Sequence, residues 1–203
     1  MNTREKLSVI LLCLGIMLAL LPLTGSRSFN VKPQRLLSEA LDEKSWFTVD
    51  QVAKFVASED STIQLVDLRS PEEFNMMNIP GSVNIPYDQF IELAPGTISV
   101  NGKMKYILYS NGDYDANNAF MIARGLKLNS VFVMEGGMNE WFNTVINSRF
   151  TGEKISAREN ALFENRRKAA TIFTEINSLP DSLKKKYYEA KHVAAKKLDG
   201  GCE

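Results

Sequence analysis

Residues 105–109 read KYILY, and this run of aromatic and aliphatic residues, which favour β-strands, is the starting point for the fold. Similar short runs precede and follow it: IQLVDL at residues 63–68, a shorter one around residues 82–85, and SVFVM at residues 130–134. Segments with helical spacing of apolar residues lie between them. Buried strands that alternate with helices predict a parallel sheet covered by helices on both faces. Ligands bind such sheets where loops leave the carboxyl ends of strands, so the loop after Tyr109 is the first place to look for a site.

The segments that precede these runs extend the pattern. Phe47 and Thr48 lead into residues 49–58, where apolar side chains recur with helical spacing, so a short strand followed by a helix capped by Thr48 is predicted. Earlier in the chain, the sequence QRLLSEAL at residues 34–41 predicts a short amphipathic helix within a linker that spans residues 29–45.

Beyond Trp141 the chain becomes strongly charged. Residues 157–176 and 182–197 predict helices separated by a Ser-Leu-Pro-Asp stretch, and the second helix is rich in lysine. Charge runs of this kind usually face solvent, so residues 149–203 are predicted to form a charged helical tail that ends in Gly-Gly-Cys-Glu. The globular domain is therefore expected to span residues 46–148.

The amino terminus has the layout of an export segment. Arg4 and Lys6 precede an apolar run from Leu7 to Leu21, and small residues follow it. The run is longer than most signal-peptide cores and shorter than the roughly 20 residues that comfortably span a bilayer. Residues 1–28 are therefore expected to be either a cleaved signal peptide or a retained membrane anchor. The basic amino end favours the cytoplasm, which places the rest of the chain outside it, in the periplasm if the cell is bacterial.

The balance of residue types excludes several classes of function. The chain has 24 basic and 24 acidic residues, so it lacks the positive field with which nucleic-acid-binding proteins gather phosphate. His192 is the only histidine, which argues against a histidine-based metal site or a Ser-His-Asp triad. The two cysteines, Cys13 in the apolar run and Cys202 beside the last residue, cannot staple the domain internally. No metal, other cofactor or nucleic-acid partner is therefore expected.

Four segments carry a resemblance to a known family: VDLRSPEEF from Val66, NIPGSVNIP from Asn78, ILYSNGDYDANNAF from Ile107 and VFVMEGGMNEW from Val131. Taken together, over roughly residues 47–141, they resemble the rhodanese-like family. The resemblance implies a five-stranded parallel sheet with helices on both faces. It also implies a loop after the fourth strand, in which active members carry a cysteine thiolate among backbone N–H groups that bind anions.

Ser110 holds the cysteine position of that loop in this sequence. The loop continues through Asn111, Gly112, Asp113, Tyr114 and Asp115 before a helix expected to begin near Ala116. A serine hydroxyl is not ionised near neutral pH, and an oxygen atom cannot carry a transferable sulfane sulfur. Asp113 and Asp115 place negative charge where active members bind anions, and Asp115 is also expected to cap the helix. Ordinary sulfur transfer at Ser110 is therefore not expected.

Further positions in the motifs bear on this interpretation. Asn111 stands where arginine is frequent in active relatives, which removes an anion clamp, and Asn78 stands where histidine is frequent. Asp67 and Arg69 are expected to form a structural ion pair that orients neighbouring loops rather than to act in catalysis.

These observations lead to two functional hypotheses. The first is an exported, membrane-anchored rhodanese-like domain that is catalytically silent at Ser110 and serves as a binding or regulatory module for a protein partner or a small ligand. The alternative is a sulfur carrier in which Cys202, on its Gly-Gly hinge, takes sulfane sulfur from a donor and presents it to an acceptor protein. Cys202 is also compatible with a disulfide between two chains, or with a terminal cysteine that has no particular role.

Overall fold

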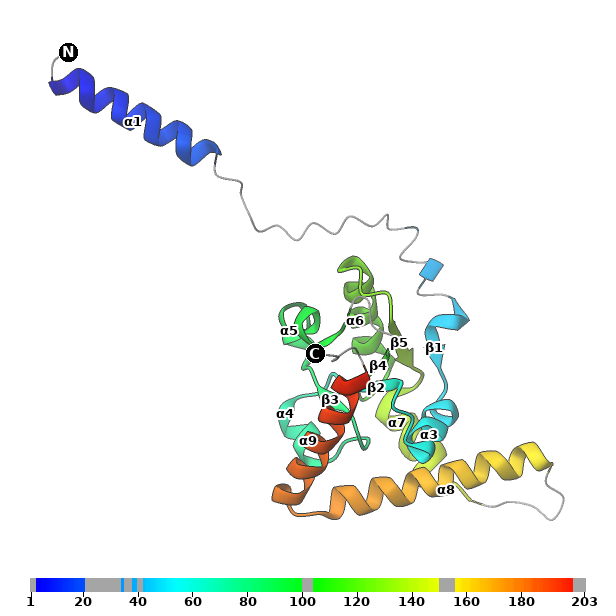
Figure 1. Ribbon diagram of the computed structural model, residues 1–203. Helices are drawn as coiled ribbons and strands as arrows, with labels where there is room; N and C mark the ends of the chain where they lie inside the picture. Colours follow the sequence, from blue (N-terminus) through cyan, green and yellow to red (C-terminus); the bar gives the residue numbers. More distant parts are fainter. Residues whose placement is uncertain are drawn as a thin grey trace.

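A computed structural model describes residues 3–20, 34, 38–39, 42–99, 104–149 and 156–198 (Figure 1). The helix predicted at residues 34–41 lies largely outside the described residues, and Cys202 with the Gly-Gly hinge lies wholly outside them. The side chains of residues 191–198, which include His192, are not described either.

The centre of the domain is a five-stranded sheet in which every pairing is parallel. The strand order is β1-β5-β4-β2-β3, so β4 and β2 lie inside the sheet and β3 lies at one edge. The strands are β1 (Trp46–Phe47), β2 (Ile63–Asp67), β3 (Val83–Asn84), β4 (Lys105–Tyr109) and β5 (Val131–Met134). All five coincide with runs that the sequence predicted as strands, and the α/β fold class is confirmed.

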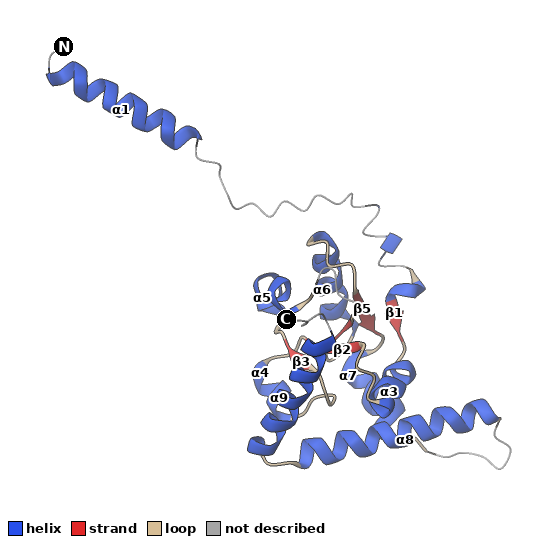
Figure 2. Ribbon diagram, viewed as in Figure 1, coloured by secondary structure: helices blue, strands red, loops and turns tan. Residues whose placement is uncertain are grey.

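Helices cover both faces of the sheet (Figure 2). On one face, α5 (Phe90–Thr97) and α6 (Asp113–Gly125) pack their apolar side chains against β2, β4 and β5. The other face is covered by α3 (Val49–Ser58), α7 (Gly137–Trp141), the following π-helical turn η3 (Phe142–Ile146) and α8 (Ala157–Ser178). The remaining elements of the domain are α4 (Pro71–Met76) and the short 3₁₀ turns η1 (Glu43–Ser45) and η2 (Tyr87–Gln89).

Sequence signals at the start of α3 act as predicted. The hydroxyl of Thr48 accepts a hydrogen bond from the Gln51 N–H, and the side-chain oxygen of Gln51 accepts one from the Thr48 N–H. This reciprocal arrangement satisfies two backbone donors that a helix end otherwise leaves unpaired, and it fixes where α3 begins.

One prediction for the carboxyl-terminal part is wrong, because α8 does not lie outside the core. Ala169 and Phe173 are buried and belong to the same apolar cluster as Trp141. The Phe173 ring lies 6.2 Å from that of Trp141 and 5.7 Å from that of Phe142, measured between ring centroids. The charged residues of α8 face solvent as expected, but the residues between them form a narrow stripe that the charge pattern concealed.

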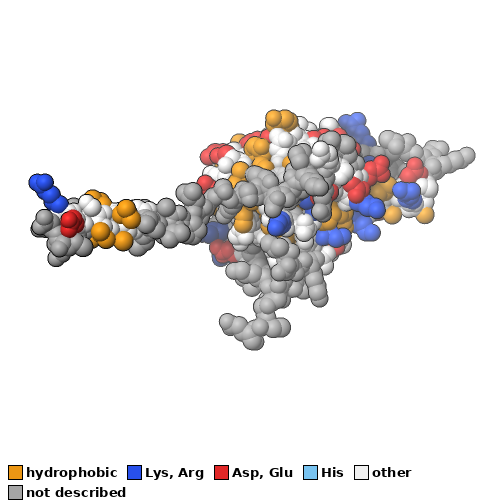
Figure 3. All heavy atoms as spheres, turned by 90° about the horizontal axis from the view of Figure 1, so that it is seen from above, with side chains coloured by type: hydrophobic (Ala, Val, Ile, Leu, Met, Phe, Trp, Pro, Cys, Tyr) orange, Lys and Arg blue, Asp and Glu red, His pale blue; other side chains and the backbone are white. Residues whose placement is uncertain are grey.

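The remaining helices lie at the two ends of the chain. They are α1 (Thr3–Leu20) and α9 (Asp181–Leu198). A search of the described part of the chain finds no helix whose length and apolar character would let it cross a membrane. On the face of the molecule seen in Figure 3, basic and acidic side chains both occur, in keeping with the balanced overall charge.

Candidate functional site

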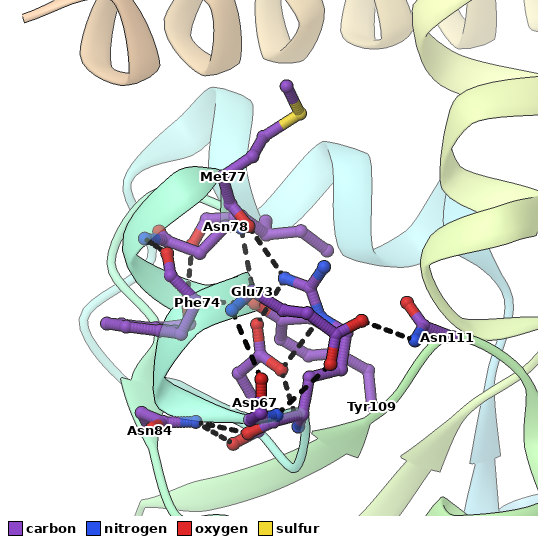
Figure 4. A network of polar contacts seen from close by, with 12 residues as sticks. Asp67, Glu73, Phe74, Met77, Asn78, Asn84, Tyr109 and Asn111 are labelled. Atoms are coloured by element: carbon purple, nitrogen blue, oxygen red, sulfur yellow. Dashed lines mark hydrogen bonds and ion pairs between the residues drawn. The ribbon is translucent and has the colours of Figure 1, made fainter.

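The carboxyl end of β2 holds the ion pair that the sequence predicted. Asp67 is the last residue of the strand and is fully buried, and Arg69 folds back over it. The Arg69 guanidinium donates from Nε to Asp67 Oδ1 at 3.0 Å and from Nη2 to Asp67 Oδ2 at 2.6 Å (Figure 4). Burial lowers the pKa of Arg69, but the hydrogen bond and the charge of Asp67 outweigh this effect and raise that pKa above its ordinary value.

The same guanidinium ties β2 to the chain that follows α4. Arg69 Nη2 also donates to the backbone carbonyl of Met77 at 2.7 Å. Because a bidentate pair fixes the plane of the guanidinium, the carbonyl of Met77 is held in a defined place beside the strand end. The ion pair therefore positions the turn that begins at Met77, which is the orienting role expected of it.

Tyr109, at the end of β4, fixes the other side of this turn. Its ring is fully buried, and its hydroxyl accepts a hydrogen bond from the Ile79 N–H at 3.2 Å and donates one to Ser82 Oγ at 3.0 Å. Burial raises the pKa of Tyr109 well above its usual range, so the hydroxyl stays protonated. Tyr109 thus has a structural role, holding the turn through its hydroxyl, rather than acting as a proton donor in a reaction.

The loop after β4 differs in detail from the sequence-based prediction. Ser110 is buried, with 3 % of its surface exposed, and helix α6 begins at Asp113 rather than near Ala116. Gly112 occupies the N-cap position, where its lack of a side chain leaves no cap hydrogen bond. The prediction that Asp115 caps the helix is therefore wrong. Acidic side chains in the first turn still complement the positive end of the helix, so no capping side chain is required.

Each of the two loop carboxylates has a different partner. Asp115 Oδ2 accepts a hydrogen bond from Ser110 Oγ at 3.1 Å, while Asp113 Oδ1 accepts one from the Gly136 N–H at 2.6 Å. The hydroxyl at the centre of the loop is thus engaged by a negative group from the loop itself. Tyr114, between the two carboxylates, has 78 % of its surface exposed.

The start of α7 forms backbone hydrogen bonds with the Ser110 loop. The N–H groups of Met138 and Asn139 donate to the carbonyls of Ser110 and Asn111 at 2.8 and 3.0 Å. Gly137 has a φ of +56°, and a Cβ placed there would lie 2.5 Å from the Ser110 carbonyl oxygen. Only glycine permits this approach, so Gly137 allows the start of α7 to lie against the backbone of the Ser110 loop.

Asn111 links the loop to α4. Its Nδ2 donates to Glu73 Oε1 at 2.8 Å, while the other oxygen of Glu73 accepts from the backbone of Ser70 as part of a capping box (Figure 4). The hydrogen bond from Asn111 lowers the pKa of Glu73. Asn111 therefore holds a neighbouring carboxylate, which sequence reasoning did not foresee.

A second polar cluster, which the sequence did not reveal, surrounds Asn78. The side-chain amide of Asn177 exchanges two hydrogen bonds with the backbone of Asn78, at 3.1 and 2.9 Å. The Tyr188 hydroxyl donates to Asn78 Oδ1 at 2.5 Å, and burial raises the pKa of Tyr188 to about 12. We call Asn78, Asn177 and Tyr188 the Asn78 junction. It joins the turn after α4 to both carboxyl-terminal helices.

Of the two cysteines, only Cys13 lies in the described part of the chain. Cys13 lies on α1 with its side chain exposed. Cys202 lies outside the described residues, so its predicted role as a sulfur carrier stays a prediction. No cluster of histidine, cysteine and carboxylate side chains that could hold a metal ion occurs among the described residues.

Comparison with known proteins gives the domain its family. Residues 48–144 match the family model described as "Rhodanese-like domain". A curated relative, thiosulfate:glutathione sulfurtransferase of Saccharomyces cerevisiae, is 25% identical over 105 residues, which cover 47% of this chain and 76% of the relative.

The chain also matches solved structures of other proteins. A single-domain sulfurtransferase of Saccharomyces cerevisiae is 24% identical, with a TM-score of 0.40 and coverage of 49% of this chain and 89% of that one. The rhodanese-like domain of an Anabaena protein is 14% identical, with a TM-score of 0.44 and coverage of 56% and 92%. On the family match and the strand order together, this chain contains a rhodanese-like domain.

Proposed function

We propose that the rhodanese-like domain is catalytically silent at the Ser110 loop and works as a binding or regulatory module. The observation that carries the proposal is the hydrogen bond from Ser110 Oγ to the carboxylate of Asp115. A domain of this family that transferred sulfur from this loop would need a thiolate here. The hydroxyl at this position can neither ionise near neutral pH nor hold a sulfane sulfur.

The electrostatics of the loop support the same proposal. A thiolate, a persulfide or a bound thiosulfate would place negative charge beside Asp115, which lies 3.1 Å from Ser110 Oγ. Like charges at such a distance repel each other, so the Asp115 carboxylate disfavours an anion at this position. Asn111 is turned to Glu73 and offers no positive charge to offset this.

Sulfur transfer through Cys202 is the second candidate. The curated relative of Saccharomyces cerevisiae is a sulfurtransferase, which favours sulfur chemistry somewhere in this chain. Apart from Cys13 in the amino-terminal apolar run, Cys202 is the only thiol in the sequence. Because oxygen cannot substitute for sulfur at Ser110, any persulfide in this protein would form at Cys202.

The test uses the full chain with thiosulfate as donor and cyanide as acceptor. We expect no thiocyanate above the uncatalysed rate for the wild type and no change in Ser110→Ala. Ser110→Cys should give at most weak turnover, because Asp115 raises the pKa of a thiol at that position. Ser110→Cys combined with Asp115→Asn should be faster than Ser110→Cys alone. Wild-type turnover that disappears in Ser110→Ala would overturn the proposal.

A persulfide-labelling experiment separates the second candidate from the first. The full chain is incubated with a persulfide donor beside Cys202→Ser and Ser110→Ala. A sulfur carrier keeps the label in Ser110→Ala and loses it in Cys202→Ser. Absence of label on Cys202, under a donor that charges a control sulfurtransferase, leaves the binding module as the function.

The proposal includes an extracytoplasmic location, with the chain exported and either released or held at the membrane by residues 1–28. It rests on Arg4, Lys6 and the apolar run that follows them in the sequence. Protease added to intact spheroplasts should digest the domain, and protection would contradict the placement. Mass spectrometry of the amino terminus distinguishes a cleaved signal peptide, with a start near Arg27 or Ser28, from a retained anchor.

A further inference from the structure

A cleft of about 770 Å³ lies at the edge of the sheet, away from the Ser110 loop. We call it the β3 cleft. One wall is the edge strand β3 with the preceding turn, a second is the end of α4, and α9 closes the third side. Figure 1 shows α9 beside α4 and β3. Its lining includes Phe74, Val83, Asn84, Lys184, Lys185 and Tyr188.

Asn84 of the edge strand lines this cleft, and its backbone N–H and C=O form no hydrogen bond with any described residue. β3 pairs with β2 on one side, and the Ile85 N–H donates to the Asp67 carbonyl at 2.9 Å. Backbone groups of successive residues in a strand point to opposite sides, so the N–H and C=O of Asn84 face away from β2. No other strand lies there in the sheet as described. Asn84 thus offers one backbone donor and one backbone acceptor to an added strand.

The opposite wall supplies a cation, which comes from α9. Lys184 of α9 lines the cleft, is half-buried, and forms no ion pair with any described residue. Lys185 follows it and is exposed. Asp181 and Glu189 also line the cleft, but both are exposed at its rim. The deeper position of Lys184 therefore favours one carboxylate from a ligand, rather than a ligand with several negative charges.

We propose that the β3 cleft binds an extended peptide segment of a partner protein, which adds to the sheet as a strand beside β3 and carries an acidic side chain that reaches Lys184. Backbone hydrogen bonds to Asn84 contribute affinity for a peptide of any sequence, and the carboxylate makes binding selective for acidic peptides. Phe74 and Val83 give the cleft an apolar surface on which an aliphatic side chain of the same peptide packs. The inference goes beyond the proposed function and does not depend on the chemistry at Ser110.

The probe is a fluorescein-labelled peptide of sequence Ser-Val-Glu-Val-Ser, followed by fluorescence anisotropy with the full chain. We expect a dissociation constant in the range of about 10–1,000 μM, which is typical of a short peptide that gains few hydrogen bonds and loses its own freedom. The matched peptide Ser-Val-Lys-Val-Ser should bind at least about fivefold more weakly, because its ammonium faces Lys184. A peptide N-methylated at alternate backbone nitrogens should not bind.

Variants of the protein and the location of binding complete the test. Lys184→Glu should lower the affinity for the Glu peptide about fivefold or more, and Lys184→Met should lower it less. Lys186→Glu, an exposed change on the same helix that does not line the cleft, is the control and should leave affinity unchanged. Hydrogen exchange should slow at the Asn84 amide. Absence of binding, equal effects of Lys184→Glu and Lys186→Glu, or protection confined to another region would overturn the inference.

Discussion

The Ser110 loop and the Asn78 junction both lie near the carboxyl ends of the central strands, and each contains a buried polar side chain, Ser110 in the loop and Asn78 in the junction. They satisfy their polar groups in opposite ways. Ser110 finds its partner within the loop, since Asp115 is five residues away along the chain. Asn78 has one local partner, the Phe74 carbonyl, and finds its other partners 99 and 110 residues away, on α8 and α9.

This difference shows how far each buried polar side chain depends on the rest of the chain for its hydrogen bonds. The Ser110 hydroxyl is satisfied locally, by a carboxylate of its own loop, and this contact could persist in a domain without carboxyl-terminal helices. The junction depends on distant segments, because the backbone and the side-chain oxygen of Asn78 are bound by Asn177 and Tyr188 only when both helices are docked. Changes in α8 or α9 should therefore be felt at Asn78, and changes in the loop should not.

Phe173→Ala should have the largest effect, because it empties the apolar seam that holds α8 on the domain. Phe173 is buried against Trp141 and Phe142, so we expect a loss of about 3–5 kcal/mol in the free energy of unfolding. Urea unfolding of the full chain measures it. Glu175→Ala, at an exposed position of the same helix, is the control and should stay within about 0.5 kcal/mol of wild type. A small effect of Phe173→Ala would mean that the packing of α8 contributes little to stability, and would contradict the view that the Asn78 junction depends on this helix.

Asn78→Ala should come next. It leaves the Tyr188 hydroxyl and the Phe74 carbonyl without their partner in a buried place, at a cost of about 2–3 kcal/mol. In a Tyr188→Phe background the same change should cost less, because one of the stranded groups is gone. The double-mutant cycle is measured by denaturant unfolding. Simple additivity would show that Asn78 and Tyr188 do not act together.

Tyr188→Phe alone should cost about 1 kcal/mol near neutral pH, the usual contribution of one hydrogen bond. The pKa of Tyr188 is raised to about 12 in the folded protein, and an unfolded tyrosine titrates near 10. The unfolded chain therefore loses its proton first as pH rises, and the native state loses stability between these two values. The difference in stability between wild type and Tyr188→Phe should shrink over that window and be constant below it. A pH-independent difference would contradict the burial of this hydroxyl.

Ser110→Ala should have the smallest effect, about 0.5–1 kcal/mol, since it removes one local hydrogen bond of a half-buried carboxylate. Its effect should add to that of Tyr188→Phe without coupling, because the two sites share no partner. Asp115→Asn serves as the companion variant, because its amide oxygen can still accept from Ser110. Strong coupling between Ser110→Ala and Tyr188→Phe would show that the loop and the junction form one unit.

The sequence predicted the parts of this structure that local patterns determine. Strands such as β4 are continuous apolar runs, Thr48 lies three residues before Gln51 as a capping box requires, and Asp67 lies two residues from Arg69. The start of α6 was missed because three polar residues, Asp113 to Asp115, fit a loop as well as a first helical turn.

The parts that could not be predicted depend on contacts between distant segments. Only Ala169 and Phe173 of the 22 residues in α8 are buried, too few to stand out against the charged residues around them. The stretches of sequence around Asn78 and Asn177 do not indicate that these two residues are partners. Their pairing arises only when α8 crosses the domain, which tertiary packing decides and local propensity does not.

The position of α8 also affects the order in which the protein becomes complete on the ribosome. Arg166 of α8 pairs with Asp50 of α3, at 2.5 Å, across a separation of 116 residues. All five strands leave the ribosome before this helix does, so the apolar surface around α3 and Trp141 is without its cover during that interval. A chain translated only to residue 149 should accordingly recruit chaperones more strongly than the full chain does, and release from the chaperone should follow the appearance of α8.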